Sequence, residues 1–441
     1  MRKLVGKGSF GLWTLVALVV GNAIGAGIYT TSGFALADLG SREWVLLAWA
    51  VGGIIALTGA ISYGMLAERL TESGGEFLYL TRSIHPFAGF IAGWISLLAG
   101  FSGAIAFAAT TFEVYLQSAI PSLSFFPADL LAVAAILFAG LIHVVRVDTG
   151  TTIHNLIVGV MVLALVYVCL FAGIGLISES WSPSAAGSYT ESFNVSAFAS
   201  SLVWISLSYS GFNAAVYVAG EASNAKLNVP SSMIIGTLII IVLYVAVNAV
   251  LLYAPLPGDI VGQAKFAAIA AHSLGGETLG IFIEIIVAIS LLTSVTAMVL
   301  AGPRVYAKMA EEGVMPRLLR FKKGAPPHTA IILQVIVAVA ITLISELREL
   351  LSYLSFTLSI SLALTVSTLF VRHIQLGERP NSKLYPIAPL LFVVATLWFA
   401  YLSSRSNQSQ LIAFLVTIAI GAIAYLGTRL SGPSPDKKDI A

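Results

Sequence analysis

Two short stretches of glycine and hydroxyl residues interrupt long apolar runs in this 441-residue sequence. The first covers residues 21–28, GNAIGAGI, and the second covers residues 206–213, SLSYSGFN. Each of the three glycines in the first stretch weakens a helix by about 1 kcal/mol relative to alanine. A helix that is broken inside a membrane exposes N–H and C=O groups, which a polar solute can pair with. The two stretches therefore predict a binding site for a small polar molecule.

Small residues at these places have a second interpretation. Gly, Ala and Ser also let two membrane helices pack closely. One such stretch alone would favour close packing. Two stretches at corresponding places in the two halves of the chain favour a transport site.

The composition indicates what surrounds these runs. Hydrophobic residues make up 58% of the chain and charged residues 10%, whereas an ordinary soluble domain is about 25% charged. One core cannot hide so much apolar surface, so we expect the bilayer to be the solvent. The net charge of +2 does not indicate a nucleic-acid partner, and a single cysteine excludes an intrachain disulfide.

Apolar runs long enough to cross a membrane recur along the whole chain. We expect twelve, at residues 12–37, 44–67, 87–118, 127–145, 152–177, 195–221, 232–254, 277–308, 328–345, 349–371, 385–403 and 408–429. Most of the 23 Lys and Arg residues then fall on one side, if the N-terminus is cytoplasmic. This predicts a multi-pass protein of the cytoplasmic cell membrane with both termini inside. No small-residue cleavage site follows the first run, so we expect it to be retained as a helix.

Several motifs resemble the amino acid–polyamine–organocation (APC) superfamily of permeases, over roughly residues 8–430. They are residues 24–29 (IGAGIY), Tyr63 and Glu68 followed by 73–77 (SGGEF), 89–94 (GFIAGW), 209–213 (YSGFN) with Glu221, and 303–316 (PRVYAKMAEEGVMP). Residues 21–27 are also similar to the first helix of the sodium-coupled leucine transporter family, which shares this fold.

The resemblance implies an all-α membrane protein with twelve transmembrane helices. Its architecture would be the leucine-transporter type, a five-plus-five inverted repeat with two added C-terminal helices. The first repeat would cover residues 12–177, the second 195–371 and the added pair 385–429. Residues 1–11 and 430–441 would be cytoplasmic ends.

The resemblance also implies secondary active transport of an amino acid. Burying a carboxylate or an ammonium group unpaired costs several kcal/mol, so the site must satisfy both. We expect the amides of Ala26, Gly27 and Ile28 to bind the carboxylate, and backbone carbonyls near both breaks to take the ammonium. The predicted substrate-binding residues are Ile24, Gly25, Ala26, Gly27, Ile28, Ala99, Leu207, Ser208, Tyr209, Ser210, Gly211 and Phe212, with Ser102 nearby.

The predicted side-chain pocket lacks a clear counter-charge for a cationic substrate. In cationic amino acid members of the superfamily an acid lies on the third helix, where this chain has Ala99. The sixth-helix position that is often Asp is Asn213 here. These residues favour a neutral, small-to-medium amino acid. Glu113, on the same third helix, is either a counter-charge or a residue near the outer interface.

Hydroxyl residues of the eighth helix resemble one sodium site of the leucine transporter family. Five oxygen ligands suited to Na⁺ would come from Gly21, Ile24, Ser290, Thr293 and Ser294. The hydroxyls of Thr293 and Ser294 have the alternative of bonding within their own helix. Sodium symport through this single site, exchange or uniport, and proton coupling therefore stay open.

Gates are expected on both sides of the site. Trp204 and Tyr209 would close the outer path, and Glu68, Glu221 and Arg304 would contribute to an inner gate of ion pairs. Aromatic packing and solvated loop charges are the alternative interpretations of these residues.

Other functional classes fit less well. The sequence has no HExxH motif, no paired intramembrane Asp and no Ser/His/Asp set, so we expect no enzyme, transition-metal site or cofactor. A permease for an amine or polyamine would not use the first-helix amides fully, and a non-transporting sensor of the same fold also stays open. The expected partners are an amino acid, Na⁺ or H⁺ and the lipid bilayer, with no obligatory protein partner.

Overall fold

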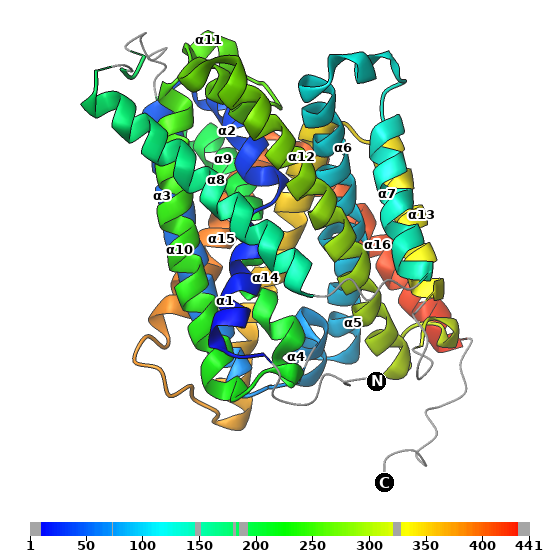
Figure 1. The fold of residues 1–441 in the computed structure, drawn as a ribbon. Helices are drawn as coiled ribbons and strands as arrows, with labels where there is room; N and C mark the ends of the chain where they lie inside the picture. Colours follow the sequence, from blue (N-terminus) through cyan, green and yellow to red (C-terminus); the bar gives the residue numbers. More distant parts are fainter. Residues whose placement is uncertain are drawn as a thin grey trace.

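The computed structural model describes residues 10–72, 74–145, 151–179, 182–184, 193–320 and 328–430, and Figure 1 shows its fold. Within this part of the chain the secondary structure is helical, apart from one isolated bridge between Phe10 and Ala222. The predicted cytoplasmic ends lie almost wholly outside the described residues. The elements are α1 (Leu12–Ala23), α2 (Ala26–Leu39), α3 (Arg42–Ala67), α4 (Gly75–Ser83), α5 (Pro86–Ile95), η1 (Ser96–Gly103), α6 (Ala104–Ala119), η2 (Pro121–Phe125), α7 (Leu130–Val145), α8 (Thr151–Ile177), α9 (Val195–Tyr209), η3 (Ser210–Glu221), α10 (Ala225–Tyr253), α11 (Pro257–Ile260), α12 (Phe266–Glu311), η4 (Arg317–Leu319), α13 (His328–Ile344), α14 (Leu347–Leu376), α15 (Ile387–Ser406) and α16 (Gln408–Leu430).

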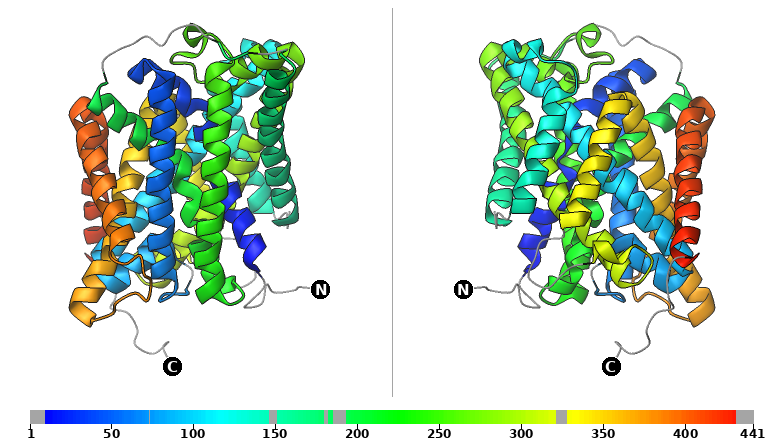
Figure 2. Two further views of the ribbon diagram at one scale, coloured as in Figure 1. Left: turned by 90° about the vertical axis from the view of Figure 1, so that its left-hand side faces the viewer. Right: turned by 90° about the vertical axis from the view of Figure 1, so that its right-hand side faces the viewer.

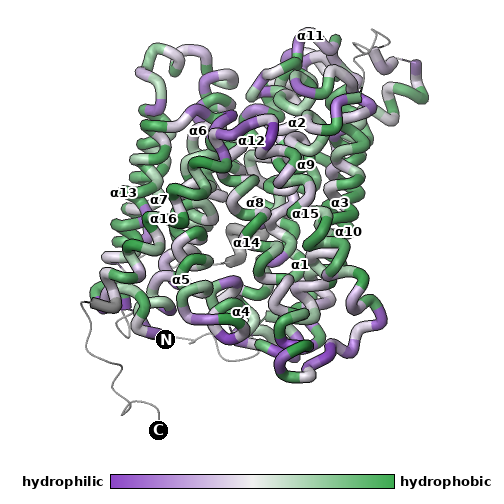
Figure 3. Tube along the Cα trace, turned by 180° about the vertical axis from the view of Figure 1, so that it is seen from behind, coloured by the Kyte–Doolittle hydropathy of each residue, from purple (hydrophilic) through white to green (hydrophobic). Residues whose placement is uncertain are grey.

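Ten helical segments of the described chain are long and apolar enough to cross a membrane. α7 and α13 are shorter apolar helices at two more of the places where we expected spans. Figure 3 shows hydrophobic residues along the middle of the bundle and hydrophilic residues gathered toward its two ends. The chain is therefore a multi-pass membrane protein.

The bundle has two ends that differ in their short elements. Figures 1 and 2 show α11 and the end of α2 at one end, which we call the α11 end. α4 and the beginning of α1 lie at the opposite end, which we call the α4 end. The first and sixth predicted spans run between these ends and are both interrupted between them.

The predicted break in the first span is confirmed. α1 ends at Ala23, and α2 begins at Ala26 with Gly25 in an extended conformation at its N-cap. Ile24 (φ −72°, ψ 89°) is also outside the helical region. The residues between the two helices are the glycine-containing stretch that weakened the helix in the sequence.

The sixth span is interrupted in a different way from the one we expected. α9 ends at Tyr209, but the chain continues as the 3₁₀ helix η3, instead of unwinding. Ser210 and Gly211 begin this tighter helix, and Val218 within it has non-helical angles (φ −119°, ψ 15°). Hydrogen bonds of a 3₁₀ helix have poorer geometry than those of an α-helix, so this half of the span is still the weaker one.

The third span contains a π-helical segment that the sequence did not predict. Residues 96–103 form η1 between α5 and α6. Such segments are rare and occur frequently at functional sites. η1 widens the helix where α13, α14 and α12 pack against it.

α12 begins before the eighth span that we expected at residue 277. It starts at Phe266 and is kinked at Gly275 and Gly276, where Gly276 has φ 69°. The part before the kink lies at the α11 end, and the part after it runs down beside α6.

Glu113 has a structural role that the sequence left open. Its side chain on α6 is buried, and its carboxylate accepts hydrogen bonds from the backbone N–H groups of Asp129 (3.0 Å) and Ala132 (2.8 Å). These groups lie at the N-terminus of α7, so Glu113 caps that helix from outside its own sequence. The carboxylate is therefore not a free counter-charge for a substrate.

We expect Glu113→Ala to destabilise the bundle by about 1–3 kcal/mol, because α7 would lose both capping bonds and a buried charge partner. The change is measured as a lower melting temperature of the purified protein in detergent. Gln117→Ala is a matched control one turn further on, which removes only the 3.3 Å contact of Gln117 with Glu113. Equal melting temperatures for wild type and Glu113→Ala would contradict the capping role.

Candidate functional site

The two interrupted spans approach each other closely at two glycines. A Cβ added to Gly27 of α2 would lie 2.3 Å from the Ser208 Oγ of α9. A Cβ added to Gly211 of η3 would lie 2.3 Å from the backbone nitrogen of Ala23. Only glycine permits backbones to approach this closely. The two glycines therefore fix the breaks against one another.

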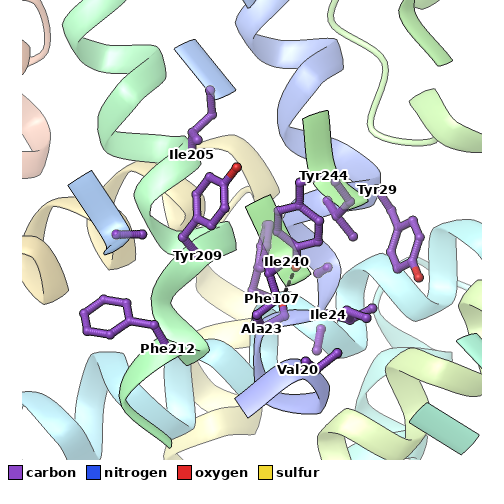
Figure 4. Packing of buried hydrophobic residues seen from close by; sticks show 14 of the residues in the cluster. Val20, Ala23, Ile24, Tyr29, Phe107, Ile205, Tyr209, Phe212, Ile240 and Tyr244 are labelled. Atoms are coloured by element: carbon purple, nitrogen blue, oxygen red, sulfur yellow. Dashed lines mark hydrogen bonds between the residues drawn. The ribbon is translucent and has the colours of Figure 1, made fainter. Parts of the chain in front are cut away.

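Side chains satisfy part of the backbone that the breaks release. The Tyr244 hydroxyl of α10 donates to the carbonyl of Ala23 at 2.6 Å, as Figure 4 shows. Ser210 donates through its Oγ to the carbonyl of Leu207 at 2.7 Å. Within the described part of the chain, no side chain caps the N-terminus of α2, where Gly25 is the N-cap residue. The first N–H groups of α2 are thus the donors that a solute would meet.

A cavity of about 180 Å³ opens at this point. Its lining residues come from the two interrupted spans, the third span, α4, α12 and α14: Asn22, Ala23, Gly25, Ala26, Gly27, Glu76, Ser96, Gly100, Phe101, Ala104, Phe107, Ala108, Leu207, Ser208, Ser210, Gly211, Asn213, Ala214, Tyr217, Ser294, Met298, Leu358, Ser361 and Leu362. From the breaks the lining continues along η3 to α4, so the cavity extends toward the α4 end.

The cavity gathers many of the residues predicted for substrate binding. Those on its wall are Gly25, Ala26, Gly27, Leu207, Ser208, Ser210 and Gly211. The predicted residues that are not on its wall are Ile24, Ile28, Ala99, Tyr209 and Phe212. On the third span, Gly100, Phe101 and Ala104 line the cavity in place of Ala99 and Ser102. The π-helical segment η1 determines which residues of the third span face the cavity.

Tyr209 and Phe212 face a different space on the other side of α9. They line a small cavity of about 40 Å³ among α3, α14 and α15.

Glu76 is a cavity residue to which the sequence assigned no role. It lies in the first turn of α4, is 4% exposed and lines the cavity. The motif SGGEF contained it, but nothing in the sequence indicated that α4 folds back against η3. The sequence feature that could have indicated a role for Glu76 was an acid beside two glycines in a short segment between spans.

Aromatic rings fill the bundle between the breaks and the α11 end. Trp49, Tyr209 and Tyr244 are buried, with ring centroids 5.2–5.7 Å apart. The Tyr209 hydroxyl donates to the Trp49 carbonyl at 3.1 Å. The cavity wall includes none of these three rings. The site is therefore separated from the α11 end by packed side chains.

Trp204 of α9, predicted as part of an outer gate, contacts two side chains of α14, and one of these also contacts α2. Its Nε1 donates to Ser352 Oγ of α14 at 2.9 Å. The Arg348 guanidinium lies 5.2 Å from the Trp204 ring centroid and also pairs with Asp38 of α2. A cation over an aromatic face stabilises such a contact.

The charged residues predicted for the inner gate lie at the α4 end, but the ion pairs there involve other acids. Arg69 and Arg372 both pair with Glu378, at 2.9 Å and 2.7 Å, and hold the pKa of its carboxyl below the usual value. Within the described residues neither Glu68 nor Arg304 forms an ion pair, and both are exposed. The backbone carbonyl of Glu221 accepts from Phe10 N–H at 3.2 Å. A second exposed pair links Arg82 to Glu312 (3.4 Å).

Of the residues predicted for a sodium site, Ser290, Thr293 and Ser294 lie on α12, and Gly21 and Ile24 lie in α1 and at its C-cap. Ser294 lines the cavity and Ser290 is buried. Thr293 Oγ1 donates to the carbonyl of Ile289 at 2.9 Å, which is the intrahelical bond considered as its alternative.

A membrane bundle with a polar cavity at two touching helix breaks defines a solute permease. The chain belongs to the amino acid permease family of the APC superfamily, whose family model matches residues 10–428. Proteins of this family are permeases and not enzymes.

Several curated transporters are similar to the chain over most of their length. The serine/threonine exchanger SteT of Bacillus subtilis (strain 168) is 26% identical over 403 residues, which cover 89% of this chain and 90% of that protein. The Asc-type amino acid transporter 1 of Homo sapiens is 26% identical over 418 residues, with 90% and 78% covered. The b(0,+)-type amino acid transporter 1 of Mus musculus is 25% identical over 398 residues, with 88% and 81% covered.

We expect Gly211→Ala to disrupt the site, because its Cβ would lie 2.3 Å from Ala23 N and 2.4 Å from Asn22 C. Neither backbone atom can move without separating η3 from α1. The expected result is a loss of substrate binding of about a hundredfold, measured on purified protein that still elutes as a single species. Gly173→Ala on α8 is the control, since its Cβ would meet no atom within 4 Å. Wild-type affinity in Gly211→Ala would show that the close approach is dispensable.

Proposed function

We propose that this protein carries a neutral, small-to-medium amino acid across the membrane by alternating access. The observation that carries the proposal is the uncapped N-terminus of α2 at the cavity, opposite the C-terminal turn of α9. The first offers N–H donors and the second offers C=O acceptors. A zwitterion needs both, and the names of the relatives support this class of substrate.

The carboxylate would bind the N-terminus of α2. Ala26 and Gly27 line the cavity, and Ile28 would add its amide from the same helical turn. Gly25 and Gly27 leave the backbone unshielded, and the positive end of the helix favours an anion.

The ammonium would bind carbonyls at the break in the sixth span. The Leu207 carbonyl already accepts from Ser210, through both its Oγ and its backbone N–H. We therefore assign the ammonium to the carbonyls of Ser208 and Ser210, which are on the cavity wall, and not to that of Ile24, which is not.

The wall for the substrate side chain is apolar. Phe101, Ala104, Phe107, Met298 and Leu358 line this part of the cavity. Glu113 is used in capping α7, and Asn213 donates to Glu76 at 2.7 Å. Among these apolar residues a cationic side chain would lose hydration without gaining a counter-charge, because the one acid on the cavity wall, Glu76, lies farther along the lining on α4, so a neutral substrate fits better.

The closed α11 end and the cavity that extends toward the α4 end fit one state of an alternating-access cycle. We propose the twelve-span, five-plus-five arrangement, with the α4 end in the cytoplasm of the cell. The cavity is then inward-facing. Trp204 with Arg348, and the ion pairs of Glu378 and Glu312, would part in turn as the two ends open. We expect one chain to suffice without a protein partner.

The proposed mode of coupling follows from the relatives. The bond from Thr293 to Ile289 uses the hydroxyl proton and leaves its oxygen lone pairs available for Na⁺, so it does not decide between the modes, whereas one relative is named an exchanger. We therefore favour exchange of amino acids over sodium symport. The sodium site of Gly21, Ile24, Ser290, Thr293 and Ser294 is the second candidate.

Purified protein in proteoliposomes should take up alanine, serine or leucine about tenfold faster than arginine or putrescine, because the apolar wall disfavours a cationic side chain. A tenfold ratio corresponds to a difference of about 1.4 kcal/mol in binding free energy. Gly27→Leu should reduce uptake to about a hundredth, since its side chain would collide with Ser208 and displace α9 from the site. Gly173→Leu is the control. Arginine or putrescine uptake exceeding that of leucine would overturn the neutral assignment.

Uptake by the same vesicles should not change when Na⁺ is replaced by choline, and should rise when the lumen is preloaded with amino acid. This is the behaviour of an exchanger. If uptake instead fell without Na⁺, and fell equally in Ser294→Ala with Na⁺ present, the sodium site would be supported and exchange rejected.

A further inference from the structure

Glu76 forms a cluster of hydrogen bonds at the wall of the cavity. Its Oε1 accepts from the Tyr63 hydroxyl at 2.9 Å and from Asn213 Nδ2 at 2.7 Å. Its Oε2 accepts from the Tyr217 hydroxyl at 2.6 Å. Three donors from α3 and η3 thus converge on one buried carboxylate of α4.

This donor set matches a carboxylate, whose two oxygens only accept. The first turn of α4 adds the positive end of a helix beside it. Glu76 therefore places a negative charge at the wall of the cavity.

The charge has no protein counter-ion. Among the described residues, no lysine, arginine or histidine pairs with Glu76, and it is the only charged residue on the cavity wall. A carboxylate has about four lone-pair positions, and three are filled. The remaining one is on Oε2, the oxygen with a single donor.

We propose that Glu76 is a second binding station on the substrate path, which holds the ammonium group of the amino acid between the helix breaks and the α4 end. This inference rests on the proposed amino acid transport and deepens it. A substrate that leaves the carbonyls at the breaks exchanges them for the open position on Oε2. The station acts on the side of the membrane that the α4 end faces, because the packed rings separate it from the other side.

The station selects for an amine and not for a carboxylate. Leucine and 3-methylbutylamine, which lacks the carboxylate, both carry the ammonium that Oε2 accepts. The hydroxy acid 2-hydroxy-4-methylpentanoate carries only the carboxylate, and the negative charge of Glu76 repels it. At the α4 side, compounds that carry an ammonium group should therefore inhibit transport, and the hydroxy acid should not.

The test compares wild type with Glu76→Gln in whole cells and in inverted membrane vesicles. We expect the KM for leucine at the α4 side to rise about tenfold or more, the size of a lost hydrogen bond to a charge. The KM at the opposite side should stay within about twofold. Inhibition by 3-methylbutylamine at the α4 side should be lost in the variant.

Two further variants separate the charge from a purely structural role. Tyr217→Phe removes one donor from Glu76 and keeps its charge, so it should retain amine inhibition at the α4 side. Glu72→Gln removes an exposed carboxylate four residues before Glu76 that is not on the cavity wall, and should leave both KM values unchanged. If Tyr217→Phe and Glu76→Gln lost amine inhibition at the α4 side to the same extent, Glu76 would only hold α4 to η3, and the proposal would be overturned.

Direct binding of 3-methylbutylamine to purified protein keeps this inference distinguishable from the proposed function. Glu76-dependent amine binding in a chain that does not transport leucine would support the station and reject amino acid transport. Leucine transport with an unchanged KM at both sides in Glu76→Gln would support transport and reject the station.

Discussion

A backbone N–H or C=O group that lacks a partner inside a membrane costs several kcal/mol, and this constraint organises the centre of the molecule. Two spans stop being α-helical there. Some of the released groups have protein partners, such as the Ala23 carbonyl bonded by Tyr244 and the Leu207 carbonyl bonded by Ser210. The uncapped start of α2 has none from a side chain, and it faces the cavity. The site is the place where the fold leaves its own hydrogen bonding incomplete.

The two ends of the bundle differ in what fills the space beyond the breaks. Toward the α11 end, three buried aromatic rings pack in edge-on or tilted contacts, which close the path by dispersion and area burial. Toward the α4 end, a carboxylate and its donors stand on the wall of an open space. One end is thus closed by apolar packing, and the other is lined by groups that can exchange partners with a solute.

Composition and apolar run lengths predicted the membrane class, and the glycines of residues 21–28 predicted the first break. The details that the sequence missed depend on contacts between distant segments. The π-helical turn at residues 96–103 keeps the same apolar character as an α-helix, so its pattern carries no signal, and it moved the cavity wall from Ala99 to Gly100 and Phe101. Glu76 was visible in a motif, but its role depends on α4 folding back toward η3. The 3₁₀ conformation of the chain after Tyr209 likewise depends on packing against α1.

The contacts of the half-helices divide the two interrupted spans into matched parts. α1 packs on η3 and α2 packs on α9, each pair on its own side of the breaks. Gly27 lies against Ser208 and Gly211 lies against the backbone of Asn22 and Ala23, so a side chain at either glycine would meet atoms of the partner half-helix. In evolutionary terms, the residues facing Gly27 and Gly211 cannot drift independently. A larger residue on one half-helix has to be matched by a displaced backbone on its partner, so the two spans inherit changes together.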